Sequence, residues 1–367
     1  MKSSLHLLSC MRAFFSILLL AIAVPVAVVA QTAAAWPEAD KLFRSDPRWL
    51  GADVASSVDL GNRRVLWMFG DTFVSRRPGE TRKNPSFVRN TVAIQTGYDP
   101  ARASIKFYWR TTKGKPTEIF PSEGETWMWP SHGIRLASRL LLFCSRVAPD
   151  RKKNSLGFQL VGWVVYIVAN PDEEPSAWKL QKIAEDHDKI ILASTVLREG
   201  EFVFLAGVSE PEHDLYLARL TVDAAAQGRF DALEWWSGKG WESHESSAQL
   251  VIRAAGTEAS VQRDPRGGGF LEVNSQGFGA SDIVMRYAPQ LEGDWSPPQK
   301  IYRPPESNAP DAFVYAGKSH PELRGADLVI TYVANGNDTR LAQDMSIYFP
   351  RFVKVQLSAH ASTPGMK

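Results

Sequence analysis

Three carboxylic side chains lie at the ends of strand-like segments, where they could act together on a substrate. Asp53 and Asp71 stand at the two ends of one predicted hairpin, and Glu258 lies at the start of another. Hydrolysis of a glycosidic bond needs two carboxyl groups, one protonated as the acid and one ionised as the base or nucleophile. Two neighbouring aspartates suit this need, because their mutual repulsion raises the pKa of one of them. The three residues are therefore our candidate catalytic set; the structural alternative for Asp71 is to cap a turn.

Polar and aromatic residues near the same strand ends are candidates for holding the substrate. Flat aromatic rings pack against the C–H groups of sugars, while polar side chains bond to the hydroxyls. A histidine or a cation beside the carboxylates would also decide which of them stays charged. For each tryptophan, packing between sheets is the alternative role. The candidate substrate-binding residues are Trp49, Trp129, His132, Arg146, Asn274, Lys318, His320 and Asn335.

The sequence carries no motif for a different chemistry. It has 7 histidines, and no two of them show the His-x-x-x-His spacing of a zinc site. A phosphate loop, a dinucleotide fingerprint and a Gly-x-Ser-x-Gly elbow are all missing from the sequence. We therefore expect no metal ligands and no required cofactor. Oxygen ligands that converge on an axis would still leave room for a structural calcium ion.

The candidate residues need a framework of strands to bring them together. Short runs rich in Val, Ile, Phe, Trp and Tyr alternate with turn residues, and no helical periodicity is sustained after the first 30 residues. A hairpin-like unit recurs about every 60 residues along the chain. These hairpins are predicted at 53–71, 130–147, 192–207, 257–274 and 315–335.

This repetition is typical of a radial array, because one sheet cannot bury both of its faces alone. We predict an all-β fold, a five-bladed β-propeller with four-stranded antiparallel blades. A pair of β-sandwiches is the alternative. In a propeller, the start of the first strand of each blade and the end of the second open onto the same face. The candidate residues are expected to meet there.

The first 30 residues are predicted to be a signal peptide. Lys2 and Arg12 precede the uncharged apolar run 13–30, which ends in the small-residue sequence Val28-Val29-Ala30. A membrane anchor is the alternative, since the run is just long enough to span a bilayer. We expect the mature chain, residues 31–367, to be a single propeller domain that is secreted or periplasmic and not attached to a membrane.

Composition and charge exclude other classes of protein. The 42 Lys and Arg residues nearly balance the 40 Asp and Glu residues, so the clustered basic excess of a nucleic-acid-binding protein is not expected. Of the 2 cysteines, only Cys144 lies beyond the predicted signal peptide, inside an apolar run. We expect a buried, inert thiol and no disulfide within the chain. Export without disulfides suits a bacterial protein, and we expect a monomer.

The sequence also resembles a known family at these residues. The segments Trp49-Leu50-Gly51-Ala52-Asp53, 66–73 and Arg89-Asn90-Thr91 look like the opening of bacterial exported proteins catalogued as domains of unknown function of the 4185 or 5005 type. Those proteins are five-bladed propellers similar to glycoside hydrolases, and some relatives are endo-D-arabinanases. Further matches are found at 293–297, 315–323, 330–335 and 348–352.

The resemblance implies a polysaccharide-directed propeller with Asp53 and Asp71 in the site. His132 departs from the pattern, because many such propellers carry an aspartate at that position. We expect a glycosidase-like protein whose partner is a polysaccharide or oligosaccharide, of furanoside or arabinan type. The first alternative is a carbohydrate-binding propeller without catalysis. The second is a protein-interaction scaffold, which would show a broad exposed apolar patch.

Overall fold

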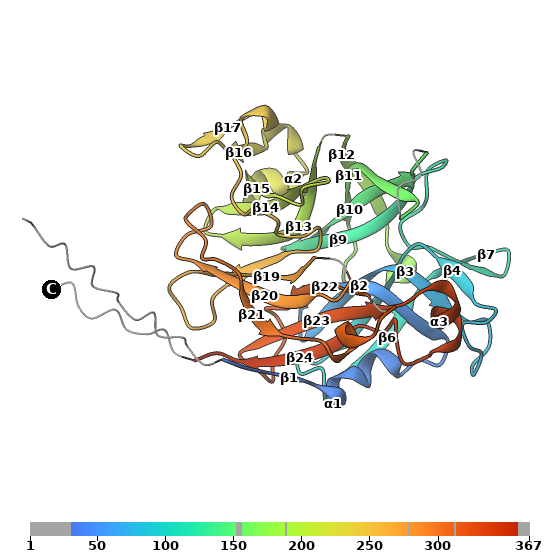
Figure 1. The fold of residues 1–367 in the computed structure, drawn as a ribbon. Coiled ribbons are helices and arrows are strands. Elements are labelled where there is room, and N and C mark those ends of the chain that lie inside the picture. The colour runs from blue at the N-terminus through green and yellow to red at the C-terminus, as the bar shows by residue number, and fades with distance from the viewer. Residues whose placement is uncertain (1–30, 152–155, 188, 278, 312, 359–367) are drawn as a thin grey trace, which may run out of the picture.

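Five antiparallel sheets are arranged around one axis as a β-propeller (Figure 1). The structure is a computed structural model that describes residues 31–151, 156–187, 189–277, 279–311 and 313–358. The predicted fold class is confirmed. The predicted signal peptide, residues 1–30, lies outside the described residues.

Each blade begins at the axis with a hairpin and continues outward by further antiparallel strands. Blade one contains β2 (Trp49–Gly61), β3 (Arg64–Val74), β5 (Thr91–Thr96) and β6 (Ser104–Tyr108), with the short β4 (Ser86–Val88) paired to β3. Blade two contains β9 (Trp127–Leu136), β10 (Arg139–Pro149), β11 (Phe158–Val168) and β12 (Leu180–Asp186). Blade three contains β13 (Ile190–Glu199), β14 (Phe202–Ser209), β15 (Leu215–Thr221), β16 (Glu234–Trp236) and β17 (Trp241–Glu242).

Blades four and five complete the ring. Blade four contains β18 (Ser260–Arg263), β19 (Phe270–Gln276), β20 (Asp282–Ala288) and β21 (Gln299–Tyr302). Blade five contains β22 (Phe313–Ser319), β23 (Leu328–Asn335), β24 (Arg351–Gln356) and β1 (Thr32–Ala35). The N-terminal strand β1 is thus the outermost strand of the last blade, and Figure 1 shows it running alongside β24. This pairing joins the two ends of the described chain within one sheet.

A small hairpin, short α-helices and 3₁₀ turns lie between the strands of the blades. Two strands outside the blades, β7 (Arg110–Thr112) and β8 (Lys115–Thr117), form a small hairpin beside β4. The α-helices are α1 (Pro37–Asp40), α2 (Val222–Gln227) and α3 (Asp338–Gln343). Single 3₁₀ turns lie at Leu42–Arg44, Pro175–Ala177, Phe230–Ala232, Glu245–Ser247 and Pro305–Asn308.

Aromatic and aliphatic side chains fill the spaces between neighbouring blades. Between blades five and one, the ring of Phe43 packs edge-on against Trp67 and stacks on Phe352. Between blades one and two, Leu66 and Leu142 belong to one buried cluster. Both faces of each inner hairpin are therefore covered, which explains the long apolar runs in these strands. Cys144 is buried in the same way, as expected.

The bounds of each predicted hairpin differ from those of its strands by a few residues, and in two hairpins the first strand was predicted to extend beyond the observed one. The fourth was predicted from Thr257, but β18 begins only at Ser260. In the fifth, β22 ends at Ser319 instead of continuing to Leu323. Pro321 lies in that stretch and has no backbone N–H to donate to a ladder. Blade three also has a fifth strand, β17, so the prediction of four strands holds for most blades but not all.

Candidate functional site

An irregularity in β2 presents Asp53 at one face of the ring. The β2–β3 register shifts between Ala52 and Val54, and Val54 has a φ of 71°, a costly left-handed conformation for a β-branched residue. The shift places Asp53 against Gly70, where an added Cβ would lie 2.4 Å from the Asp53 Oδ1 atom. Only glycine at position 70 leaves room for this carboxyl group.

The carboxyl group of Asp53 is held by a tyrosine from blade five. Tyr315 Oη donates to Asp53 Oδ2 at 3.0 Å, and Asn335 Nδ2 donates to the same Tyr315 oxygen at 3.3 Å. The Oδ1 atom is buried and has no hydrogen-bond partner among the described residues. Burial, followed by the charge of Asp71, raises the pKa of Asp53 well above its usual range, and Glu258 adds to the effect. This environment therefore favours the protonated form of Asp53.

Asp71 lies across the hairpin in a different environment. Trp129 Nε1 donates to its Oδ1 atom at 2.9 Å, and Arg89 Nη1 lies 3.2 Å from its Oδ2 atom. Burial raises the pKa of Asp71 to about 6, while the Trp129 hydrogen bond and the Arg89 charge oppose the rise. Above that pH, Asp71 is ionised. The environments of the two aspartates therefore differ, as those of an acid and a base must.

The segment Arg89-Asn90 positions the partners of Asp71. The guanidinium of Arg89 lies 4.0 Å from the centre of the Trp127 ring, which holds it in place. Asn90 is buried, and its Nδ2 atom donates to the Met128 carbonyl at 2.9 Å. This bond ties blade one to the strand that carries Trp129. One short motif thus orders both groups that stabilise the Asp71 carboxylate.

Glu258 and Lys318 form the central part of the site. Burial raises the pKa of Glu258, and the charge of Lys318 opposes the rise. Lys318 lies on blade five and is buried, and its Nζ atom donates to Ser56 Oγ of blade one at 3.0 Å and to the Ser194 carbonyl of blade three at 3.3 Å. Its ammonium group therefore contacts inner strands on several sides of the axis. Burial lowers the pKa of Lys318 to about 8.

His132 reaches the same region as a neutral side chain. Its Nδ1 atom lies 3.0 Å from the Gly133 carbonyl. Burial, and then the charge of Lys318, lower the pKa of His132 to about 3. It can therefore form hydrogen bonds to a substrate, but it cannot supply a positive charge at neutral pH.

Two predicted substrate contacts, Trp49 and His320, instead belong to the core. The exposure of Trp49 is 1%, and its ring stacks on Phe107 at 4.5 Å. His320 is also 1% exposed, with Ser57 Oγ 2.5 Å from its Nδ1 atom and Thr331 Oγ1 2.8 Å from its Nε2 atom. Both side chains point between blades and not toward the open face. The expectation that they touch substrate is therefore corrected.

Arg146 and Asn274 have partners other than the candidate catalytic carboxylates. Arg146 pairs with Glu185 at 2.5 Å and with Glu123 at 3.7 Å, toward the outer strand of blade two. Asn274 is buried, and its side-chain amide donates to the Ala255 carbonyl. Of the predicted residues, the structure brings together Asp53, Asp71, Glu258, Trp129, His132 and Lys318, with Asn335 joined through Tyr315.

Four site residues had no role assigned from the sequence: Gly70, Arg89, Tyr315 and Tyr348. Tyr348 Oη donates to the backbone carbonyl of Asp71 at 3.0 Å. Arg89, Tyr315 and Tyr348 all lie in segments that carry the family resemblance, which is the one signal that marked them. Their contacts join residues far apart in the sequence, so local spacing could not assign their roles.

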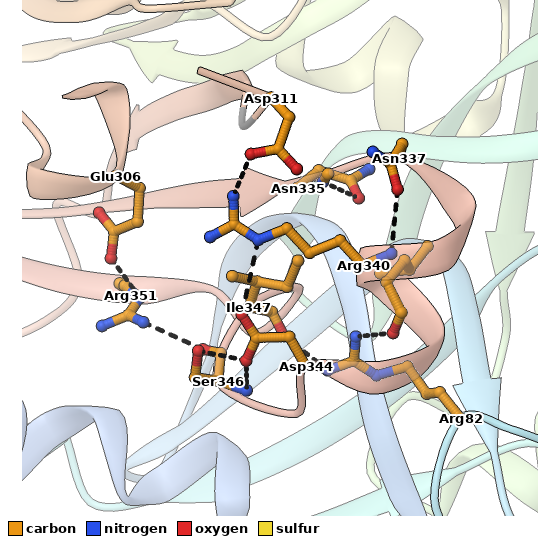
Figure 2. A network of polar contacts seen from close by, with 12 residues as sticks. Arg82, Glu306, Asp311, Asn335, Asn337, Arg340, Asp344, Ser346, Ile347 and Arg351 are labelled. Carbon is orange, nitrogen blue, oxygen red and sulfur yellow. Dashed lines mark hydrogen bonds and ion pairs between the residues drawn. The ribbon is translucent and has the colours of Figure 1, made fainter. Parts of the chain in front are cut away.

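The loops of blade five form an open hollow next to Asn335. Figure 2 shows Arg340 of α3 between Asp311, at 2.8 Å, and Asp344, at 3.6 Å. The hollow has a volume of ≈ 930 Å³, and every side chain that lines it can form hydrogen bonds. The catalytic candidates do not line it. It is lined by Asp311, Asn337, Asp338, Thr339, Arg340, Gln343 and Asp344.

Metal and membrane features can be judged only for the described part of the chain. There, His, Cys, Asp and Glu side chains do not gather in any group of three or more that could hold a metal ion. A calcium ion on the axis stays a prediction, and the ammonium group of Lys318 would repel it. Among the same residues, no helix is long and apolar enough to cross a membrane.

Comparisons with known proteins agree with this architecture. The sequence profile of a family described as "Domain of unknown function (DUF5005)" matches residues 38–357. A search of curated protein sequences gives no match. A protein from Bacteroides ovatus, provisionally assigned as a hydrolase, superposes with a TM-score of 0.71 at 15% identity, over 89% of this chain and 90% of that chain.

Two solved structures of glycoside hydrolases are more distant. An exo-β-1,3-galactanase from Phanerochaete chrysosporium, solved with β-1,3-galactotriose, gives a TM-score of 0.50 at 11% identity, over 84% of this chain and 62% of that chain. An α-L-arabinofuranosidase catalytic domain of family GH62 from Coprinopsis cinerea gives 0.46 at 11% identity, over 86% and 98%. At such identities the likeness concerns the fold alone.

Proposed function

The chain belongs to the DUF5005 family of domains of unknown function, and we propose that it is a glycoside hydrolase that cleaves a polysaccharide with Asp53 and Asp71. The contrast between these two carboxyl groups carries the proposal. Burial and nearby negative charge favour the protonated form of Asp53. A tryptophan N–H and an arginine favour the ionised form of Asp71. Glycoside hydrolysis needs one carboxyl group in each state.

The two groups have complementary roles in the proposed reaction. Asp53 donates its proton to the glycosidic oxygen as the bond from that oxygen to the anomeric carbon breaks. Asp71 attacks the anomeric carbon as that bond breaks, and a covalent bond between Asp71 and the sugar forms. Water then attacks the anomeric carbon, the bond to Asp71 breaks, and one proton of the water returns to Asp53. Tyr315 holds Asp53 in place through its hydrogen bond at 3.0 Å.

The proposed reaction retains the configuration of the sugar. The ladder places Ala52 opposite Thr72 and Val54 opposite Phe69, so Asp53, Gly70 and Asp71 lie in the irregular stretch between these pairs. The charge of Asp71 raises the pKa of Asp53, which supports a short separation between the two carboxyl groups. In retaining enzymes this separation is about 5–5.5 Å, and the ionised group attacks the sugar directly. We therefore propose Asp71 as the nucleophile.

Glu258 and Lys318 tune the acid in this scheme. The negative charge of Glu258 raises the pKa of Asp53, while Lys318 limits how far the pKa of Glu258 itself rises. Neither group needs to touch the scissile bond. His132 and Trp129 are the remaining side chains of this face that we assign to substrate contacts.

The place of action and the substrate class follow from the sequence. The predicted signal peptide supports export to the periplasm or the medium. The family resemblance supports a furanoside polymer such as arabinan. The mechanism uses no cofactor. Glycoside hydrolases with this fold support a carbohydrate as the partner.

Product release from a panel of polysaccharides tests the proposal. Purified protein is incubated with arabinans, galactans, xylans and mannans, beside folded Asp53→Asn and Asp71→Asn variants. We expect new reducing ends from at least one polymer, and a loss of about 10²- to 10⁴-fold in rate in each variant. Binding of a polymer without cleavage, unchanged by either substitution, would support the carbohydrate-binding alternative instead.

A further inference from the structure

Exposed cations gather on one side of the face that carries Asp71. They come from the loop between β3 and β4 and from the β7–β8 hairpin. These two segments are neighbours, because β8 packs beside β4 (Figure 1). We call this group the basic rim; it consists of Arg76, Lys83, Arg110, Lys113 and Lys115.

The basic rim differs from Arg89 and Arg340, two other cations of this face, in having no carboxylate partners among the described residues. Arg89 pairs with Asp71 at 3.2 Å, and Arg340 pairs with Asp311 at 2.8 Å. Among the described residues, no basic-rim side chain lies within ion-pairing distance of a carboxylate. Like charges held together repel one another, and they attract ligands of opposite charge. The β3–β4 loop also carries Glu80, which accepts a hydrogen bond from Ser75 Oγ at 2.6 Å, so the rim presents a net positive charge.

An exposed aromatic ring lies between the basic rim and Asp71. Phe87 of β4 is 45% exposed and is one of two large apolar side chains with such exposure in the described chain. Its ring packs against Phe73 at 5.3 Å, and the Arg89 guanidinium lies 5.1 Å from it. It offers a flat surface of the kind that packs on sugar rings. Arg89 and Phe87 thus connect Asp71 to β4, the strand beside which β8 of the basic rim packs.

We propose that the basic rim and Phe87 bind anionic groups of the polysaccharide, such as carboxylates or sulfates, on sugars beyond the cleaved bond. The proposal rests on the proposed function, because it places the same polymer on the same face. Arg89, the cation beside Asp71, is already paired, so the charged sugars lie farther out. Nucleic acid is also anionic, but its phosphates continue along the whole strand and would meet the carboxylate of Asp71, whereas a polysaccharide can carry its charges only on the outer sugars.

Binding measurements with charge-matched variants test the proposal. The host is the folded Asp53→Asn protein, so that the polymer is not degraded. The rim variant adds Arg110→Gln, Lys113→Gln and Lys115→Gln, all on the exposed hairpin. The control variant adds Arg63→Gln, Arg139→Gln and Arg198→Gln, which lie in or next to hairpin turns at the opposite face. It removes the same charge elsewhere.

Affinity electrophoresis is run with polygalacturonate, neutral linear arabinan and a DNA duplex, at low and at physiological salt. We expect the rim variant to bind polygalacturonate about tenfold more weakly than the host at low salt, because each exposed charge contributes modestly. The difference should shrink as salt screens the charges. The control variant should bind like the host.

The rim assignment is overturned if polygalacturonate does not retard the host, if both variants lose affinity equally, or if DNA binds more tightly than either polysaccharide. These results are separate from the proposed function. Cleavage of a neutral polymer by the wild-type protein, without polygalacturonate binding by the host, would support the hydrolase function and exclude the rim assignment. Rim-dependent binding without cleavage of any polymer would support the rim assignment and exclude the hydrolase function.

Discussion

The indole of Trp129, on the inner strand of blade two, donates its N–H to the carboxylate of Asp71, on the second strand of blade one, at 2.9 Å. This bond crosses the boundary between two blades. It favours the ionised form of Asp71, so the charge of Asp71 in blade one depends on the position of Trp129 in blade two. The contact also explains why Trp129 is half-buried while remaining part of the open face.

Replacement of Trp129 tests the ionisation of Asp71. With a pKa of about 6 for Asp71, activity should fall as the pH drops through 6, because the protonated group cannot attack. Trp129→Phe keeps a ring but removes the donor that lowers this pKa. The pKa therefore rises, and the acidic limb of the kcat/KM profile should move to higher pH. An unchanged limb would show that Asp71 does not control it. Trp178→Phe, which removes an N–H bonded to the Glu173 carbonyl, is the control.

Gly70 should be required for activity more than for folding. A Cβ at this position would lie 2.4 Å from Asp53 Oδ1, so Gly70→Ala must displace the carboxyl group. We expect a loss of at least about 10²-fold in kcat, since a small misplacement of a reacting group has effects of this size. Gly240→Ala is the matched control, because nothing lies within 4 Å of its added Cβ. Full activity in Gly70→Ala would exclude Asp53 as the acid.

The configuration of the first product should match that of the substrate. Asp53 and Asp71 belong to neighbouring strands of one hairpin, and the proposed direct attack by Asp71 retains the configuration of the sugar. Proton NMR of a freshly cleaved oligosaccharide, recorded before mutarotation, distinguishes the two anomers. Initial release of the inverted anomer would place a water molecule between Asp71 and the sugar.

His320 should stabilise the fold without taking part in the reaction. His320→Ala removes a buried ring and leaves the hydroxyl groups of Ser57 and Thr331 without their partner. We expect the free energy of unfolding in urea to fall by about 2–4 kcal/mol, with unchanged kcat/KM for the folded fraction. His244→Ala, at an exposed position, should change stability by less than about 0.5 kcal/mol. A normal stability with reduced kcat/KM would return His320 to the site.

The hairpins could be predicted from the sequence because their signals are local. Apolar runs interrupted by turn residues such as Gly61-Asn62-Arg63 are enough to mark each pair of strands. In the structure, Asn62 and Arg63 both have positive φ, as a tight hairpin turn requires. The recurrence of this unit then predicted the ring. The predicted strand bounds were wrong where the chain leaves the hydrogen-bonded ladder of a sheet, as it does before Ser260.

The site was only partly predictable, because its contacts join different blades. Asp53 and Asp71 share one hairpin, and their proximity follows from its register. The side-chain partners Arg89 and Tyr315 come from outside that hairpin, and no spacing rule connects them to the aspartates. Trp49 and His320 were wrongly expected to contact substrate, because position near a strand end does not show whether a side chain points to the open face or between blades.

The pairing of β1 with β24 gives the site an order of assembly. Blade five is complete only after Arg351–Gln356 has been synthesised and has met Thr32–Ala35 near the other end of the chain, a late and slow kind of contact. Tyr315 and Lys318 belong to this blade. Until this blade packs against blade one, Asp53 lacks its hydrogen bond to Tyr315. In the proposed reaction, the acid is therefore held in place only after the last blade has joined the ring.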